Sequence, residues 1–316
     1  MDANKVTIVT YHYVRDLKIS RYPEIRGLEK DLFVNQLNYF KKNYSIVSIQ
    51  EVLHAIESDK MLPGNALLLT FNDNYIDHFK NVFPILHDMN LSGCFFPEVK
   101  AIKEPIVLPN HKIHFILAST VNTADIVNRI YQLLDQLRPE YSLLQNEDYY
   151  SKLAGGKGYD SDEVVFIKKL LQNELPEKVS NQIINQLFLE FVDVSEEVLS
   201  KELYMTEKQI KCMHHHGMYF GIIGYNHKDL TSISINEADF EIKKSMSFFI
   251  DNGINPEMLT MSYPWNQTSD SIIDLLKNYG IKAAFTGGGK VADLNNESKY
   301  RLPRFDTNDF PKTSKI

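Results

Sequence analysis

The chain has 316 residues, 43% of them hydrophobic and 24% charged, a composition typical of a globular protein with one large core or two smaller ones. Its formal net charge of −7, without a basic block, argues against nucleic acid or an anionic membrane as the main partner. Two distant cysteines exclude a disulfide framework, no apolar run reaches the roughly 18 residues of a membrane span, and the start of the sequence carries no secretory signal, so we expect a cytoplasmic protein.

The first third of the chain alternates short apolar runs with stretches of helical spacing. The run from Ala66 to Phe71, polar only at Thr70, predicts a strand buried on both faces. Ser48, with Glu51 three residues later, predicts a capping box at the start of a helix. The predicted strands are 6–11, 45–47, 66–71 and 91–96, and the predicted helices lie at 31–42, after Ser48, and at 75–89. This alternation is typical of parallel βα units.

The rhythm breaks between 98 and 205, where the sequence is polar and mostly helical, and we interpret this segment as one inserted subdomain. Its predicted helices are 111–118, 123–137, 161–172 and 176–191. Alternation resumes at Thr206, which forms a second predicted capping box with Gln209. The later predicted strands are 219–223, 258–262 and 282–285, and the helices are 206–218, 236–252 and 268–279. The predicted domains are therefore 1–97 and 206–316, two parts of one α/β fold, and the helical insertion 98–205.

Polar and aromatic residues gather just after the predicted strands. They are His12, Asn72-Asp73-Asn74, Tyr225-Asn226-His227, Tyr263-Pro264-Trp265 and Arg304-Phe305-Asp306. In a closed parallel barrel these residues would face one mouth, where ligands bind. Tyrosine and tryptophan beside polar groups suit a sugar ring, whose faces are apolar and whose rim carries hydroxyls.

The order of these motifs resembles the NodB-homology polysaccharide deacetylases, the fourth carbohydrate esterase family. The family motif T-F-D-D-G corresponds to residues 70–74, and the histidine motif H-[ST]-x-x-H corresponds to residues 223–227. Further similarity lies in Tyr11-His12-Tyr13-Val14, Ser262-Tyr263-Pro264-Trp265 and Leu302-Pro303-Arg304-Phe305. The resemblance implies a distorted (β/α) barrel of the NodB type with a large helical insertion, and hydrolysis of acetyl groups on sugars with a divalent metal, usually zinc.

The departures from the family pattern affect the chemistry directly. Asn72 stands where the family has its catalytic base, and a neutral amide cannot take a proton from water. Ile223 stands where the first metal-binding histidine is expected, and Asn74 replaces the motif glycine. Only Asp73 and His227 of the metal triad remain, which is fewer than the three protein ligands of a typical catalytic zinc site. We therefore expect an incomplete zinc site.

The resemblance also implies roles for the other residues at the predicted mouth. The catalytic positions would be His12, Asn72 and Arg304; the substrate-binding positions Asn74, Tyr225, Tyr263, Trp265 and Asp306; and the metal-binding positions Asp73 and His227. No histidine follows His227, so a general-acid histidine is absent from its usual late position. His12 could supply that acid from the first strand, or it could be a hydrogen-bonded structural residue.

The remaining histidines are interpreted as structural. His214, His215 and His216 lie near a predicted helix end, where consecutive side chains diverge and histidine suits the helix dipole. His111 and His114 share one face of a helix in the insertion, either as a ligand pair or because that helix packs on or covers the barrel mouth. His78 and His87 are predicted to face solvent on the helix after the central strand.

Two functional hypotheses stay open at this point. The first is a deacetylase-like hydrolase that cleaves the C–N amide of an N-acyl sugar, with zinc-dependent activity weakened or lost. The second is a catalytically inactive pseudoenzyme that binds carbohydrate or regulates. The expected partner is an N-acylated sugar or glycan precursor, with no nucleic acid, no membrane span and homo-oligomer formation through the helical insertion.

Overall fold

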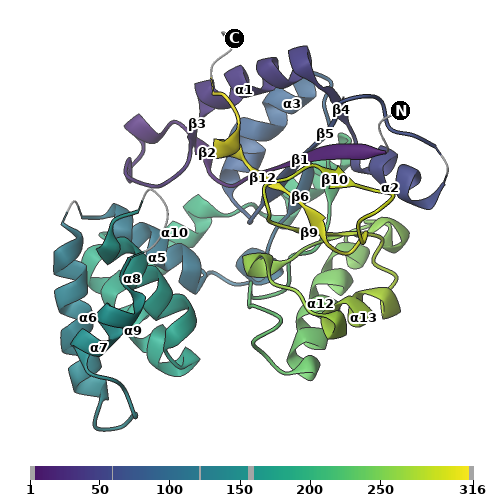
Figure 1. The fold of residues 1–316 in the computed structure, drawn as a ribbon. Coiled ribbons are helices and arrows are strands. Elements are labelled where there is room, and N and C mark those ends of the chain that lie inside the picture. Colours follow the sequence, from purple (N-terminus) through teal and green to yellow (C-terminus); the bar gives the residue numbers. More distant parts are fainter. Residues whose placement is uncertain (1–3, 59, 121, 156–159, 313–316) are drawn as a thin grey trace. The chain divides into compact units, whose positions relative to one another are not determined.

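The computed structural model describes residues 4–58, 60–120, 122–155 and 160–312. The chain forms two compact units, which we call the barrel unit and the helical unit (Figure 1). The barrel unit comprises Met1–Asp16, Gly27–Pro105 and Lys201–Ile316, and the helical unit comprises Leu17–Arg26 and Ile106–Ser200. The junctions that the sequence predicts, at 97/98 and 205/206, stay a prediction about domain organisation.

The barrel unit is built around β5 (Ala66–Asn72), in which every residue is buried. On one edge, β5 pairs in parallel with β1 (Lys5–Tyr11) along six successive residues. On the other edge it pairs in parallel with β4 (Ser45–Val47) and then, nearer its carboxyl end, with β6 (Cys94–Phe96). The predicted strand, buried on both faces of a parallel sheet, is confirmed.

The sheet returns to its first strand. From β6 the parallel order continues to β7 (Tyr219–Phe220), and a bridge between Ile222 and Met261 leads to β8 (Met261–Ser262) and β9 (Ala284–Thr286). β9 pairs with β11 (Leu302–Pro303), and β12 (Phe305–Asp306), one residue further along the chain, pairs with β1. These pairings close a distorted (β/α) barrel, as predicted.

Three shorter strands complete the sheets of the barrel unit. β10 (Ala292–Asp293) pairs antiparallel with the start of β1, while β2 (Val14–Arg15) and β3 (Leu28–Glu29) form a small parallel pair. None of these three was predicted, because a two-residue strand has no periodicity to recognise.

Helices follow most strands of the barrel unit. They are α1 (Lys30–Asn43), α2 (Ile49–Glu57), the π-helical turn η2 (His78–Val82), α3 (Phe83–Asp88), α4 (Val99–Lys103), α11 (Glu207–His215), α12 (Ile235–Asp251) and α13 (Asp270–Asn278). Short 3₁₀ turns lie at η4 (Pro256–Met258), η5 (Pro264–Asn266) and η6 (Thr307–Asp309). Both predicted capping boxes are confirmed, with Ser48 and Glu51 at α2 and Thr206 and Gln209 at α11.

The helical unit consists of packed amphipathic helices. They are α5 (Pro109–Ala118), α6 (Thr123–Leu137), α7 (Asn146–Leu153), α8 (Asp162–Lys169), η3 (Leu170–Glu174), α9 (Glu177–Phe191) and the start of α10 (Glu196–Leu203), preceded in the chain by the turn η1 (Leu17–Ile19). Arg129 on α6 donates two hydrogen bonds of 2.7 Å to Glu190 on α9. In the described part of the chain, no helix is long and apolar enough to cross a membrane. Oligomer formation through these helices stays a prediction.

Candidate active site

Three residues predicted for the site have a left-handed backbone. Asp73 (φ 71°) follows β5, His227 (φ 60°) lies in the loop after β7, and Trp265 (φ 56°) lies in the turn after β8. Residues other than glycine rarely adopt this conformation, which costs free energy and is concentrated at functional sites. The left-handed backbone therefore occurs at the same strand ends where the sequence motifs predict the site.

Asp73 is the centre of the candidate site. Its side chain is 5% exposed, and its Oδ2 accepts a hydrogen bond of 2.7 Å from His12 Nδ1. Its Oδ1 lies 3.6 Å from His227 Nε2. The structure thus brings together the two predicted metal ligands, Asp73 and His227, and places His12 beside them.

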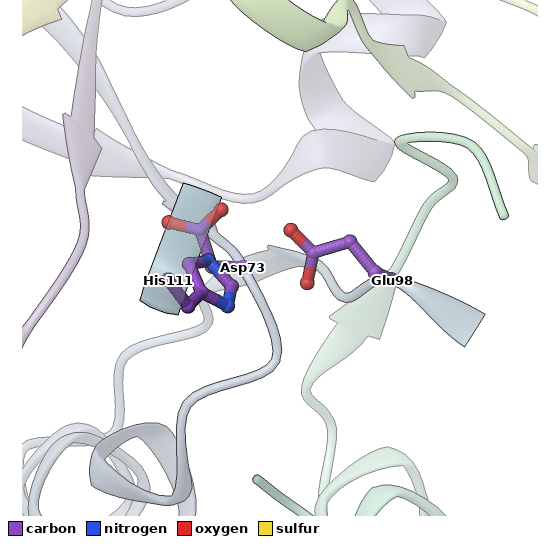
Figure 2. A group of neighbouring side chains, drawn as sticks. All are labelled: Asp73, Glu98 and His111. Carbon is purple, nitrogen blue, oxygen red and sulfur yellow. The ribbon is translucent and has the colours of Figure 1, made fainter. Parts of the chain in front are cut away.

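Glu98 is a further acid at this site, and the sequence analysis missed it. It is the second residue after the end of β6 and is fully buried. Its Oε2 accepts a hydrogen bond of 2.9 Å from the backbone N–H of Asn74. Its Oε1 lies 3.8 Å from His227 Nε2. Figure 2 shows the Glu98 carboxylate turned towards Asp73. Burial, together with the nearby charge of Asp73, raises the pKa of Glu98 well above its usual value.

Arg304 and Asn72 form a second buried group. The Arg304 guanidinium donates to Asn72 Oδ1 at 2.9 Å and to Ser262 Oγ at 2.8 Å, and the Ser262 hydroxyl also donates to Asn72 Oδ1 at 3.0 Å. These acceptors are neutral, and burial lowers the pKa of Arg304 to about 10. The amide at the base position is therefore fixed by an arginine that lies within hydrogen-bonding distance of it.

The His12 ring is held in place on one side and accessible to solvent on the other. Its Nδ1 is held by Asp73, while 46% of its side chain is exposed. Partial burial alone would lower the pKa of His12, but the charge and hydrogen bond of Asp73, helped by the charge of Asp306, raise it above its usual value. An imidazole oriented by a carboxylate in this way is suited to general acid–base chemistry.

The predicted aromatic residues take different places. Trp265 is half-buried, donates from Nε1 to the His227 carbonyl at 3.2 Å, and presents its ring edge-on to the His227 ring at 5.4 Å. Tyr225 is half-buried and donates to Glu104 at 3.1 Å. Tyr263 is 1% exposed and donates to the Tyr300 carbonyl at 3.0 Å, and its predicted substrate contact stays a prediction. Trp265 therefore packs against the predicted metal ligand His227.

Two predicted substrate-binding residues are engaged by the protein itself. Asn74 is fully buried, and its amide donates to the Met205 carbonyl at 3.1 Å. Asp306 caps the turn η6 and accepts from Asn308 N at 2.8 Å. These contacts hold loops in place, and the substrate contacts predicted for both residues stay predictions.

A shallow cavity of ≈ 470 Å³ lies at the carboxyl ends of β9 and β11. Its lining includes Asn266, Thr286, Gly287, Lys290 and Arg301. Thr286 also accepts a 3.4 Å hydrogen bond from Arg304 Nε through its carbonyl. The cavity therefore adjoins the strands that carry Arg304 and Trp265.

His78 was predicted to face solvent, and this prediction is wrong. The side chain is fully buried, its Nε2 donates to the His12 carbonyl at 3.0 Å, and its ring meets Phe71 and Phe95 at centroid distances of 5.6 Å. Burial lowers the pKa of His78 to about 4. The residue thus supports the backbone of His12 from inside the barrel unit.

We expect acid to destabilise the fold through His78. The pKa is about 4 in the folded state and about 6.5 in the unfolded state, so between these values the unfolded chain binds more protons and stability falls as the pH decreases. From about pH 7 to pH 5 this one residue accounts for a loss of about 2 kcal/mol. His78→Gln, which retains an N–H donor, should lose that part of the pH dependence in urea unfolding. The control is His54→Gln on an exposed position of α2, and a pH dependence of His78→Gln equal to that of the wild type would contradict the assignment.

The other histidines lie on helices or at a helix end. His214 and His215 are in the last turn of α11, and His216 caps it, donating from Nδ1 to the Cys212 carbonyl at 2.8 Å. His111 and His114 lie on α5 in the helical unit, with ring centroids 5.8 Å apart. The helix-end interpretation of 214–216 agrees with this geometry.

Comparison with known proteins bears on the fold. No family model and no curated protein matches the chain. Among solved structures, it is similar to the Streptococcus pyogenes deacetylase PplD in complex with acetate (TM-score 0.58, 16% identity, covering 96% of this chain and 93% of that chain). It is also similar to the BpsB deacetylase domain from Bordetella bronchiseptica (0.58, 13%, 96% and 96%) and to a de-N-acetylase from Aggregatibacter actinomycetemcomitans (0.56, 15%, 95% and 94%). The chain therefore has the fold of the NodB-homology deacetylases, as predicted.

Proposed function

We infer that this protein removes acyl groups from N-acylated sugars by hydrolysis, with His12 as the group that transfers protons. The observation that carries this proposal is the pair formed by His12 and the buried Asp73, 2.7 Å apart, at the carboxyl ends of β1 and β5. The solved neighbours described as deacetylases support the type of reaction by analogy of fold.

Hydrolysis of the amide requires two proton transfers. Water adds to the acyl carbon and loses a proton to the surrounding solvent, and the C–N bond then breaks with transfer of a proton to the amine nitrogen. His12, whose raised pKa favours the protonated ring, is suited to give that second proton, with Asp73 holding the imidazolium. A zinc ion held by Asp73 and His227 would lower the pKa of a bound water. Because Asn72 cannot accept the first proton, we propose that turnover is slow.

A second candidate function is carbohydrate binding without turnover. It is favoured by Asn72, which occupies the base position as an amide fixed by Arg304 and Ser262. In that case the protein would hold a sugar near Asp73 and Trp265 without cleaving it. Both candidate functions use the same residues, and a measurement of catalysis distinguishes the two functions.

The experiment is an assay of acetate release by the purified protein, combined with calorimetric titration of the same sugars. The expectation of a cytoplasmic protein favours a nucleotide- or lipid-linked N-acetyl sugar over finished polymer, so the assay includes a nucleotide-linked N-acetylhexosamine and chitin oligomers. Acetate release supports the hydrolase, and binding without release supports the pseudoenzyme. The absence of both release and binding for every sugar would overturn both candidates.

A further inference from the structure

The His227 ring lies close to two buried carboxylates of the barrel unit, those of Asp73 and Glu98. His227 Nε2 lies 3.6 Å from Asp73 Oδ1 and 3.8 Å from Glu98 Oε1. These distances exceed the 2.7–3.2 Å of an N–H···O hydrogen bond. They are close to the roughly 3.4 Å that separates two ligand atoms bound about 2.1 Å from a tetrahedral zinc ion. His227 Nε2 is therefore spaced from each carboxylate oxygen as one metal ligand is from another.

Each carboxylate is oriented by a contact on its far side. His12 Nδ1 donates to Asp73 Oδ2, and the backbone N–H of Asn74 donates to Glu98 Oε2. The other oxygen of each carboxylate faces His227. None of the described residues donates a hydrogen bond to Glu98 Oε1, which is buried. Outer contacts that fix ligand orientation in this way are characteristic of metal sites.

The sequence lacks the first metal-binding histidine of the NodB-homology family, and Glu98 can take its place as the third ligand. Ile223, at the position of the first histidine, is fully buried in an apolar cluster with residues such as Phe96 and Phe285. Glu98 enters from the end of β6, the strand between β5 and β7 in the sheet. We propose that Glu98 is the third protein ligand of a divalent metal ion bound by Asp73 and His227. The predicted incomplete site is thereby completed within the barrel unit.

This proposal deepens the proposed function, on which its meaning for catalysis rests, but its test needs no substrate. Chelator-treated protein is titrated with Zn²⁺ by calorimetry, and metal content is measured after dialysis. We expect one ion per chain in the wild type. Glu98→Gln, which keeps the size of the side chain, should weaken zinc binding by more than the roughly 10–100-fold that loss of an outer contact costs. Asp73→Asn and His227→Gln should behave alike.

The control is Glu257→Gln, at an exposed acid on η4, which should bind zinc as the wild type does. Thermal unfolding of each variant with and without zinc separates folding from binding: Glu98→Gln should melt cooperatively and lose the zinc-dependent rise in Tm. A wild type that binds no zinc, or a Glu98→Gln variant that binds it as tightly as the wild type, overturns the assignment. Zinc binding through Glu98 without acetate release would leave the ligand set intact and count against the hydrolase alone.

Discussion

Asn72→Asp is expected to raise the rate of acetate release by about 10²–10⁴-fold, the usual contribution of a positioned general base. The side chain at this position is 7% exposed and already accepts hydrogen bonds from Arg304 and Ser262, so a carboxylate of the same shape fits the same contacts. The change supplies the proton acceptor for water that the proposed chemistry lacks. It is measured as kcat on the sugar that the wild type turns over or binds.

The same substitution has a second readout that does not depend on activity. The buried Arg304 charge now has only neutral acceptors within hydrogen-bonding distance among the described residues, and charge-assisted hydrogen bonds are stronger than neutral ones. A carboxylate at position 72 should therefore raise the pKa of Arg304 and increase the free energy of unfolding by about 1–2 kcal/mol. Urea unfolding of wild type and variant measures this difference.

The control for both readouts is Asn255→Asp, which makes the same chemical change at an exposed residue whose side-chain oxygen accepts a hydrogen bond from the Glu257 N–H and can keep it. It should leave acetate release and stability close to those of the wild type. If Asn72→Asp is more stable but no faster, position 72 is an arginine partner and not the place of a base. If Asn72→Asp is neither more stable nor faster than the wild type, the alignment of residues 70–74 with the family motif is refuted.

The sequence predicted those features that local patterns determine. β5 was recognisable because six apolar or hydroxyl side chains in a row fit only a strand covered on both faces, and the caps at Ser48 and Thr206 because their box partners lie three residues on. The strand-end rule also placed Asp73 and His227 near each other. It held because parallel strands deliver their carboxyl ends to the same edge.

Glu98 escaped the same rule although it also follows a strand. The next hundred residues have helical spacing, so residue 98 was predicted to begin the insertion. Its carboxylate was therefore interpreted as part of a polar segment. Only the closed sheet, with β6 between β5 and β7, shows that the end of β6 lies beside Asp73. Long-range pairing of this kind leaves no local signal.

His78 was misplaced for a different reason. With 3.6 residues per turn, the predicted apolar face of the helix after β5 consists of Ile76, Phe79, Phe83 and Leu86. Ile76 and Leu86 are buried as predicted, but the turn η2 is π-helical, which adds a residue to the turn and brings His78 and Val82 inward as well. A periodicity argument assumes regular helix and cannot anticipate such a turn, and π-helical turns are frequent near functional sites.

His12→Asn is expected to lower acetate release by about 10²–10⁴-fold, in the wild type and in the Asn72→Asp background alike. Asparagine can retain a hydrogen bond to Asp73 but cannot carry a proton to the leaving amine. The faster Asn72→Asp background makes the loss measurable even if wild-type turnover is low. His54→Asn on the exposed face of α2 should leave the rate unchanged in both backgrounds.

The pH profile distinguishes proton transfer from structural support. Because Asp73 raises the pKa of His12, the protonated ring persists above pH 6.5, and activity that needs this acid should fall as the pH rises through the raised pKa. The His12→Asn variant should lose that limb of the profile together with its rate. A purely structural His12 would instead give a variant with lower stability and an unaltered pH profile at temperatures where it is folded. That outcome would leave Asp73 and its neighbours as a binding site and would favour the carbohydrate-binding candidate over the hydrolase.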